Sequence, residues 1–187
     1  QTIFAMSKRP TEAWRSAALF EDGMGQIVVA RFKGSGETEA GVFLLDTFCL
    51  GVKNAFFVRV SAHEYETRIL GQMFPEGDQL AMTPSCARKL VEDGIAYARR
   101  AGIEPHSDYK KAARVFGGID AAACGESFTF GRDGKPFYVQ GPHDSPDYVA
   151  HVFRMLRAKL GLTGFHYMVT VGAADEIGPE FADDDLE

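Results

Sequence analysis

The chain has 187 residues, of which 45% are hydrophobic, 25% charged and 12% aromatic. This length and composition are typical of one globular domain that can build its core without metals or disulfides. No apolar run approaches the roughly 20 residues that span a bilayer, and no signal peptide precedes the first elements. We therefore expect a soluble, cytoplasmic protein with no membrane partner.

The formal net charge is −6, and residues 175–187 contribute seven carboxylates and no base to it. Without that segment, 20 basic side chains face 19 acidic ones. Proteins that bind duplexes usually present a basic face, because neutralisation of phosphates supplies most of their non-specific affinity. Nucleic acid is therefore a disfavoured partner, although the charge does not exclude it. We expect a single domain over residues 1–172 and a flexible acidic tail over residues 173–187.

The three cysteines, Cys49, Cys86 and Cys124, are odd in number and far apart. That spacing resembles neither a disulfide framework nor a zinc site with paired ligands. Reduced thiols in a reducing compartment are the simplest expectation, and they agree with a cytoplasmic location.

The first half of the chain alternates between apolar segments and glycine-rich turns. Residues 10–20 predict a short helix that ends at the glycines which follow. Residues 26–32 and 40–45 predict two paired strands joined by a polar loop at 34–37, and residues 55–60 predict a third strand. The first two strands are almost continuously apolar, which indicates central positions in a sheet covered on both faces.

Four further helices carry clear start signals. Ser61 with Glu64 forms a capping box, and Thr83 precedes a proline at the first helical position. The helix after Thr83 has an apolar stripe, arginines in its last turn and a glycine stop at Gly102. Residues 107–116 predict a shorter helix, and Ser145 starts the last one.

The remaining segments predict strands. Residues 127–130 and 137–139 predict a hairpin around the turn at 131–134, and residues 165–171 predict a final strand. Hairpins dominate this order of elements, so we expect an α+β fold of one domain, with a mainly antiparallel sheet and about four to five helices packed on it.

Three stretches of the chain resemble a family of uncharacterised bacterial proteins. They read LLDTFCLGVKNAFF at residues 44–57, KLVEDGIAYARRAGIEPHSDY at 89–109 and SFTFGRDGKPFYVQGP at 127–142. The similarity covers most of the chain, from about residue 25 to 171. It implies a bacterial, cytoplasmic origin, and it brings no activity, cofactor or site residue with it.

Two similar loops form the first candidate site. His106 and Asp108 in one, and His143 and Asp144 in the other, stand just where a helix begins. Imidazole and carboxylate together suit a divalent metal, and two meeting loops could supply four ligands. A helix start could also hold an anion such as phosphate. The structural alternative, which we favour, is that Asp and Ser cap the helices and the histidines are incidental.

The second candidate is Asp46, which leaves a strand beside Cys49 and Lys53. Strand ends often carry sites, and an acid there resembles the metal-binding carboxylates of ribonuclease-H-like nucleases. Such nucleases need three or four converging acids, and only Asp46 and Asp120 stand in suitable places. We favour a structural role, in which the strand leaves the sheet through a glycine turn and Cys49 packs as a small hydrophobic side chain.

Cys86 is the third candidate, because the first turn of a helix lowers the pKa of a thiol. A nucleophile also needs a base, and His106 is the nearest histidine in sequence. A half-buried, inert cysteine explains the position equally well.

No motif names a reaction. The leading hypothesis is a non-catalytic module that binds another protein or regulates it. The alternative is a metal-dependent hydrolase or nuclease that uses His106, Asp108, His143 and Asp144. Apart from that possible divalent metal, no cofactor is implied.

Overall fold

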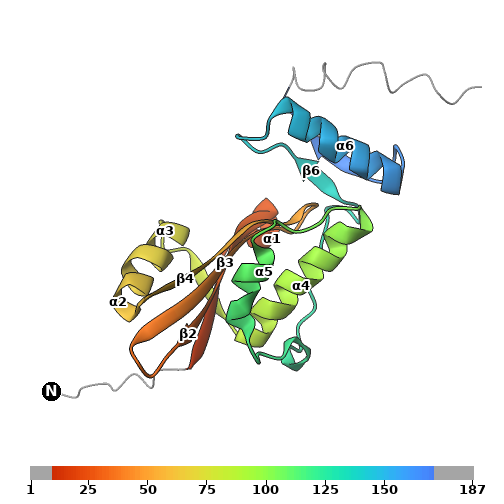
Figure 1. Ribbon diagram of the computed structural model, residues 1–187. Helices are drawn as coiled ribbons and strands as arrows, with labels where there is room; N and C mark the ends of the chain where they lie inside the picture. Colours follow the sequence, from red (N-terminus) through yellow and green to blue (C-terminus); the bar gives the residue numbers. More distant parts are fainter. Residues whose placement is uncertain (1–9, 171–187) are drawn as a thin grey trace, which may run out of the picture.

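A computed structural model describes residues 10–170 of the chain as one α+β domain. Its main element is a five-stranded antiparallel sheet in the order β4-β3-β2-β1-β5 (Figure 1). The strands are β1 (Thr11–Ser16), β2 (Met24–Phe32), β3 (Glu37–Asp46), β4 (Gly51–Ser61) and β5 (Gln79–Met82). The predicted fold class and the two central strands are confirmed.

Helices cover both faces of this sheet (Figure 1). Side chains alternate along a strand, so Val29 and Phe43 face α4 (Pro84–Arg100), α5 (Tyr109–Ala112) and the short 3-10 helix η2 (Ala113–Phe116). Val28 and Val42 face the opposite layer, in which Tyr65, Ile69 and Phe74 are buried. The continuous apolar character of β2 and β3 follows from this double coverage.

The helix starts predicted at Ser61, Thr83 and Ser145 are confirmed, whereas the helix predicted over 107–116 begins at Tyr109 without a side-chain cap and continues as η2. Thr83 Oγ1 accepts the Cys86 N–H at the start of α4, and Ser61 and Glu64 form the capping box of α2 (Ala62–Glu64). The second helix continues as the π-helix η1 (Tyr65–Leu70) and α3 (Gly71–Met73). At the end of α4, Ile103 N–H donates to Ala98 C=O. This hydrogen bond completes the predicted C-cap at Gly102.

The predicted helix over residues 10–20 is wrong. Residues 11–16 form β1, which pairs with β2 on one side and with β5 on the other, and only α1 (Leu19–Asp22) is helical. Helix propensity is a weak preference, and here two backbone ladders override it. Neither ladder could be seen in the local pattern, because β5 is short and lies more than 60 residues away.

The predicted hairpin over residues 127–139 is also wrong. Residues 127–130 form no strand, and β6 (Phe137–Val139) pairs in parallel with β7 (His166–Met168). Helix α6 (Pro146–Leu160) connects the two strands, so the end of the domain is a β-α-β unit, visible at the top of Figure 1. A parallel pair needs such a crossover. Phe128 and Phe130 instead pack against the main core.

The expectation of three reduced thiols is wrong as well. Cys86 and Cys124 form a disulfide across a sequence separation of 38 residues, and Cys49 is a buried free thiol. The acidic tail predicted over 173–187 lies outside the described residues. Within residues 10–170, no helix combines the length and the apolar character that crossing a membrane requires.

Candidate functional site

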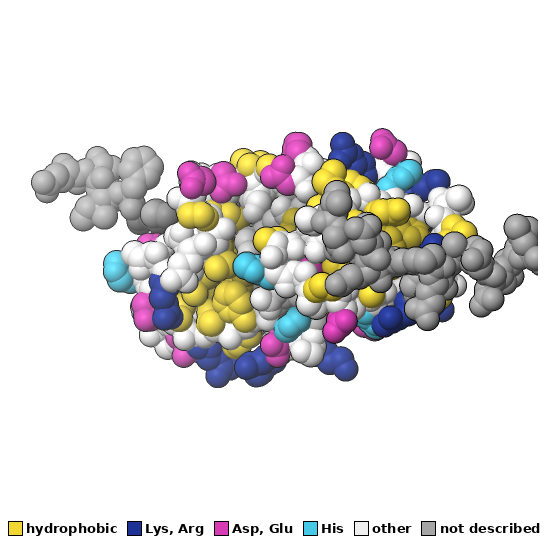
Figure 2. Space-filling model, turned by 90° about the horizontal axis from the view of Figure 1, so that it is seen from above, with side chains coloured by type: hydrophobic (Ala, Val, Ile, Leu, Met, Phe, Trp, Pro, Cys, Tyr) yellow, Lys and Arg dark blue, Asp and Glu magenta, His cyan; other side chains and the backbone are white. Residues whose placement is uncertain are grey.

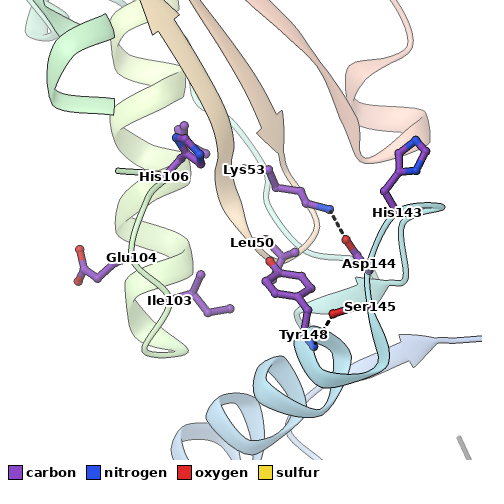
Figure 3. A pocket seen from close by; sticks show the side chains of 10 residues that line it. Leu50, Lys53, Ile103, Glu104, His106, His143, Asp144, Ser145 and Tyr148 are labelled. Atoms are coloured by element: carbon purple, nitrogen blue, oxygen red, sulfur yellow. Dashed lines mark hydrogen bonds and ion pairs between the residues drawn. The ribbon is translucent and has the colours of Figure 1, made fainter. Parts of the chain in front are cut away.

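A cavity of about 410 Å³ lies between the main sheet and the β-α-β unit (Figure 3). This volume is within the range of small-ligand and peptide pockets. Three distant segments form its wall, namely residues 50–53, 103–106 and 143–148. The lining side chains are those of Leu50, Val52, Lys53, Ile103, Glu104, His106, His143, Asp144, Ser145 and Tyr148.

The first two segments meet because β4 begins against the end of α4. Gly51 has φ +66°, and a Cβ there would lie 3.0 Å from the Gly94 carbonyl oxygen of α4, so a larger residue would force the two elements apart. His106 N–H then donates to Val52 C=O at 2.9 Å, which holds the loop after α4 beside β4. These contacts place the Lys53 and His106 side chains in the same cavity.

The third segment is fixed by the start of α6. Ser145 Oγ accepts the Tyr148 N–H at 3.2 Å as the helix cap. Asp144 Oδ2 accepts from the Gly141 N–H at 2.8 Å and from the hydroxyl of Tyr138, a fully buried residue of β6, at 3.0 Å. Burial and the nearby Asp144 carboxylate raise the pKa of Tyr138, so this hydroxyl stays protonated and can donate.

Lys53 is the least satisfied charge in the cavity. Its side chain is only 15% exposed, and its ammonium lies 3.7 Å from Asp144 Oδ1, beyond hydrogen-bond distance (Figure 3). No hydrogen bond to any residue in the described range 10–170 satisfies its three donors. The ammonium remains open to the solvent of the cavity, so its three donors are available to an acceptor that binds there.

The two histidines lie on opposite sides of the Lys53–Asp144 pair in Figure 3. His106 Nδ1 accepts the Asp108 N–H at 3.2 Å, so in the neutral ring the proton is on Nε2, which is a donor. His143 is exposed. Together with Lys53 and the Tyr148 hydroxyl, these rings make the cavity rich in hydrogen-bond donors.

The predicted metal site is assembled only in part. His106, His143 and Asp144 line the cavity, whereas Asp108 does not. Asp144 is engaged by Lys53, Tyr138 and the Gly141 N–H. Among residues 10–170, no three His, Cys, Asp or Glu side chains converge closely enough to hold a metal ion. Both loops border the same cavity, which they share with the Lys53 ammonium.

The two remaining candidate residues lie elsewhere. Asp46 is 4% exposed, and its Oδ1 accepts the N–H groups of Phe48 and Cys49 at 2.8 and 2.9 Å, which forms the turn into β4. Burial raises the pKa of Asp46 to about 6, although those N–H groups oppose the shift. Cys86 is bound to Cys124 and offers no free thiol in this state. Asp120 accepts the Ala122 N–H as a local cap.

Sequence reasoning gave little weight to Lys53 and none to Tyr138 or Tyr148. The sequence held one signal for Tyr148. This residue stands three positions after the helix cap Ser145, so it lies near the start of the helix that follows the His143 loop. Tyr138 carried none, because no motif showed that its hydroxyl would donate to Asp144.

The chain matches no protein-family model, no curated protein and no solved structure. The resemblance to a family of uncharacterised bacterial proteins therefore stays a prediction.

Proposed function

We propose that this protein is a non-catalytic binding module that holds an acidic segment of a partner protein in the cavity beside Lys53. The observation that carries the proposal is the Lys53 ammonium, which borders the cavity on a largely buried side chain and has no hydrogen-bonded acceptor within residues 10–170. A carboxylate of a partner would supply that acceptor, and charge-assisted hydrogen bonds are among the strongest in proteins.

The groups around Lys53 favour the binding of an acidic ligand. His106 Nε2 and the Tyr148 hydroxyl add neutral donors, and the N-terminal end of α6 favours negative charge at the same wall. Asp144 and Glu104, which both line the cavity, oppose a further carboxylate, but two protein donors already bind Asp144 Oδ2 and Arg99 pairs with Glu104 at 2.9 Å. Leu50, Val52 and Ile103 offer an apolar surface for the aliphatic part of an acidic side chain.

The hydrogen bonds around the cavity favour binding over acyl transfer. A serine nucleophile needs a base in hydrogen-bond contact. Ser145 Oγ instead accepts the Tyr148 N–H, and within the described part of the chain no hydrogen bond joins it to a histidine. The metal-dependent alternative lacks a converging ligand set in the same part of the chain.

The surface is consistent with a protein partner. Basic and acidic side chains are interspersed around the face shown in Figure 2, and hydrophobic side chains gather in several places between them. Leu162, Tyr167 and Met168, all near the end of α6 or on β7, are each more than half exposed. Interfaces combine such apolar anchors with a polar rim, whereas nucleic-acid surfaces concentrate one sign of charge.

Selection from a random peptide library would test the proposal. We expect enrichment of peptides that contain Asp or Glu, and Lys53→Gln should weaken their binding roughly tenfold, as expected for one lost charge-assisted bond. Arg154→Gln neutralises an exposed cation on α6 and is the matched control, with unchanged affinity. Enriched peptides without acidic residues, or equal affinity for Lys53→Gln, would refute the proposal.

A further inference from the structure

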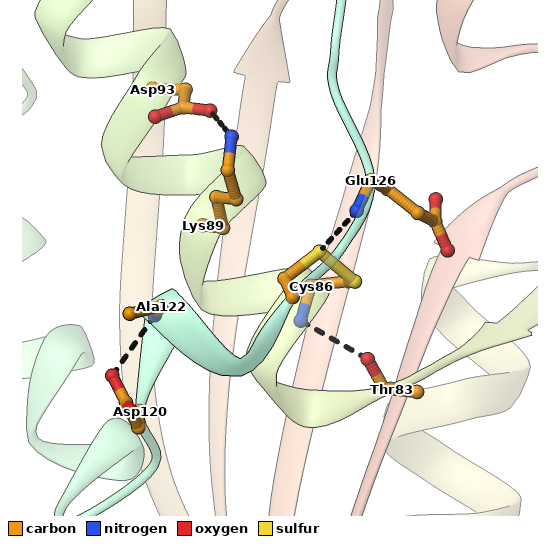
Figure 4. The surroundings of a disulfide bond; sticks show 8 residues. Thr83, Cys86, Lys89, Asp93, Asp120, Ala122 and Glu126 are labelled. Carbon is orange, nitrogen blue, oxygen red and sulfur yellow. Dashed lines mark hydrogen bonds and ion pairs between the residues drawn. A yellow bond between two sulfur atoms is a disulfide. The ribbon is translucent and has the colours of Figure 1, made fainter.

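Residues 117–136 form a long connection, here called the strap, between η2 and β6, and it contains the short 3-10 helix η3 (Ala121–Ala123). Across these 20 residues the only buried side chain is Cys124, which is 9% exposed. All the others are exposed or half-buried. Figure 4 shows the strap passing the first turn of α4, where the disulfide to Cys86 joins the two segments. The strap therefore has one buried anchor, and that anchor is covalent.

The two ends of the strap have further attachments. Near the start, Arg88 Nη1 donates to Ile119 C=O at 2.7 Å. Near the other end, Gly131 N–H donates to Thr47 C=O at 2.9 Å, and the Phe130 ring stacks on Tyr97 with centroids 5.5 Å apart. These contacts do not involve sulfur and persist when the disulfide is broken.

The middle of the strap lies against α4, but no hydrogen bond, ion pair or ring contact joins residues 120–127 to the rest of the described chain. Over residues 120–127, the recorded hydrogen bonds join the strap to itself, as in Ala122 N–H to Asp120 Oδ1 and Glu126 N–H to Cys124 Sγ. The helical side of the bond is rigid by contrast, because Cys86 is 3% exposed and lies next to Ala87 and Leu90 in the main core. Breaking the disulfide therefore frees Cys124 with the strap, whereas Cys86 stays fixed in the core.

We propose that the Cys86–Cys124 disulfide is a redox latch, whose reduction by a dithiol releases residues 120–127 from α4 while the domain stays folded. The core does not depend on the bond, because a chain of this length buries enough apolar surface without covalent links. Small disulfide-dependent domains differ in that respect. The effect of reduction is local, since only the strap loses its anchor.

The exchange follows ordinary thiol–disulfide chemistry. A thiolate of the dithiol attacks the Sγ of Cys124, which is the more exposed of the two residues, and the S–S bond breaks with its electron pair moving to Cys86 Sγ, which takes up a proton. The second thiol of the reductant then attacks the mixed disulfide and releases Cys124 as a thiol. The protein gains two electrons and two protons, and the dithiol becomes a disulfide. Cys86 is the favoured leaving group, because the start of a helix stabilises negative charge.

Hydrogen exchange measured by mass spectrometry on the full chain, with and without dithiothreitol, tests the latch. We expect amide exchange over residues 120–127 to accelerate on the order of tenfold or more, with the strands β2 and β3 unchanged, as for a local opening. Cys124→Ser should reproduce the reduced pattern without reductant. Alkylation of the folded, reduced protein should modify Cys124 before Cys49, which is buried in the core and serves as the internal control.

Three outcomes would overturn the proposal. The first is a free-thiol count of three in protein purified without reductant. The second is unchanged exchange over residues 120–127 after reduction. The third is uniform acceleration across the sheet, either on reduction or in Cys124→Ser, because it would make the bond a requirement of the whole fold. Cys86→Ser separates the last case from a packing defect specific to position 124.

Discussion

The Lys53 ammonium lies 3.7 Å from Asp144 Oδ1, and this ion pair joins the five-stranded sheet to the β-α-β unit. Lys53 is in β4, whereas Asp144 stands before α6. Both side chains are largely buried, at 15% and 13% exposed, so solvent screens their interaction only weakly. The position of Asp144 therefore sets how Lys53 presents its donors to the cavity.

The hydrogen bond from Tyr138 to Asp144 should stabilise the cavity wall. Tyr138→Phe removes the donor and leaves the ring in place, and we expect the free energy of unfolding to fall by about 1–3 kcal/mol, as for bonds to a charged group. Urea denaturation measures the change. Tyr167→Phe, at an exposed position of β7, is the control and should change stability by less than about 0.5 kcal/mol. Equal effects of the two changes would contradict the importance of this bond.

Asp46 should make the protein less stable as pH rises. Its folded pKa of about 6 exceeds the ordinary value of 3.8, so its contribution is full below pH 4 and is lost as pH rises through 6. Asn at this position keeps an acceptor for the turn but does not ionise. The stability of Asp46→Asn relative to wild type should therefore increase by about 2 kcal/mol between pH 4 and 7.5. Denaturation at the two pH values measures it, and a constant difference would contradict the assignment.

Glu39 should have the opposite pH dependence. Arg31, Lys33 and Arg59 lie within 2.6–3.3 Å of its carboxylate, and the bond to Arg31 contributes most to lowering its pKa to about 2. Its stabilising effect is present above the ordinary pKa of 4.5 and is lost as pH falls toward 2.

Glu39→Gln should therefore reduce stability at pH 7 by roughly 2–4 kcal/mol, because three cations would lose their shared partner. The loss should shrink on acidification. Glu104→Gln breaks the exposed pair with Arg99 and provides the control, with an expected change below about 0.5 kcal/mol. A loss for Glu39→Gln no larger than that of the control would contradict this account.

Metal should not contribute to stability. Asp144 is engaged by protein donors, and the described residues hold no converging set of three ligands. Treatment with EDTA, followed by addition of Zn²⁺, should leave the melting temperature within about 1 °C, whereas a structural zinc site would shift it strongly. A clear rise with one equivalent of Zn²⁺ that is lost in His106→Ala would restore the metal-dependent alternative.

The elements that depend on local chemistry could be predicted from the sequence. Thr83 and Ser145 mark helix starts because a side-chain oxygen must satisfy free N–H groups within one turn. Long-range pairings were beyond such reasoning. The pairing of β1 with β5, and of Cys86 with Cys124, depends on how distant segments pack, and no local spacing encodes it.

The candidate site, like the fold, could be predicted from the sequence only in part. The similarity of the loops at His106 and His143 raised the possibility that they meet, and both loops line one cavity, but the sequence showed neither whether they converge nor what chemistry they share. That chemistry depends on Lys53, whose place follows from the close approach of Gly51 to α4, and on Asp144, which is oriented by its hydrogen bonds with the Tyr138 hydroxyl and the Gly141 N–H.

The central claim is that an acidic partner segment binds in the cavity between the sheet and the β-α-β unit. Backbone NMR shifts recorded during titration with a selected acidic peptide test it most directly. The account predicts that the largest shifts fall in residues 50–53, 103–106 and 143–148, and that they need roughly tenfold more peptide in Lys53→Gln. Shifts concentrated instead around Phe56 and Met73, in the small hollow on the opposite face of the sheet, would contradict it.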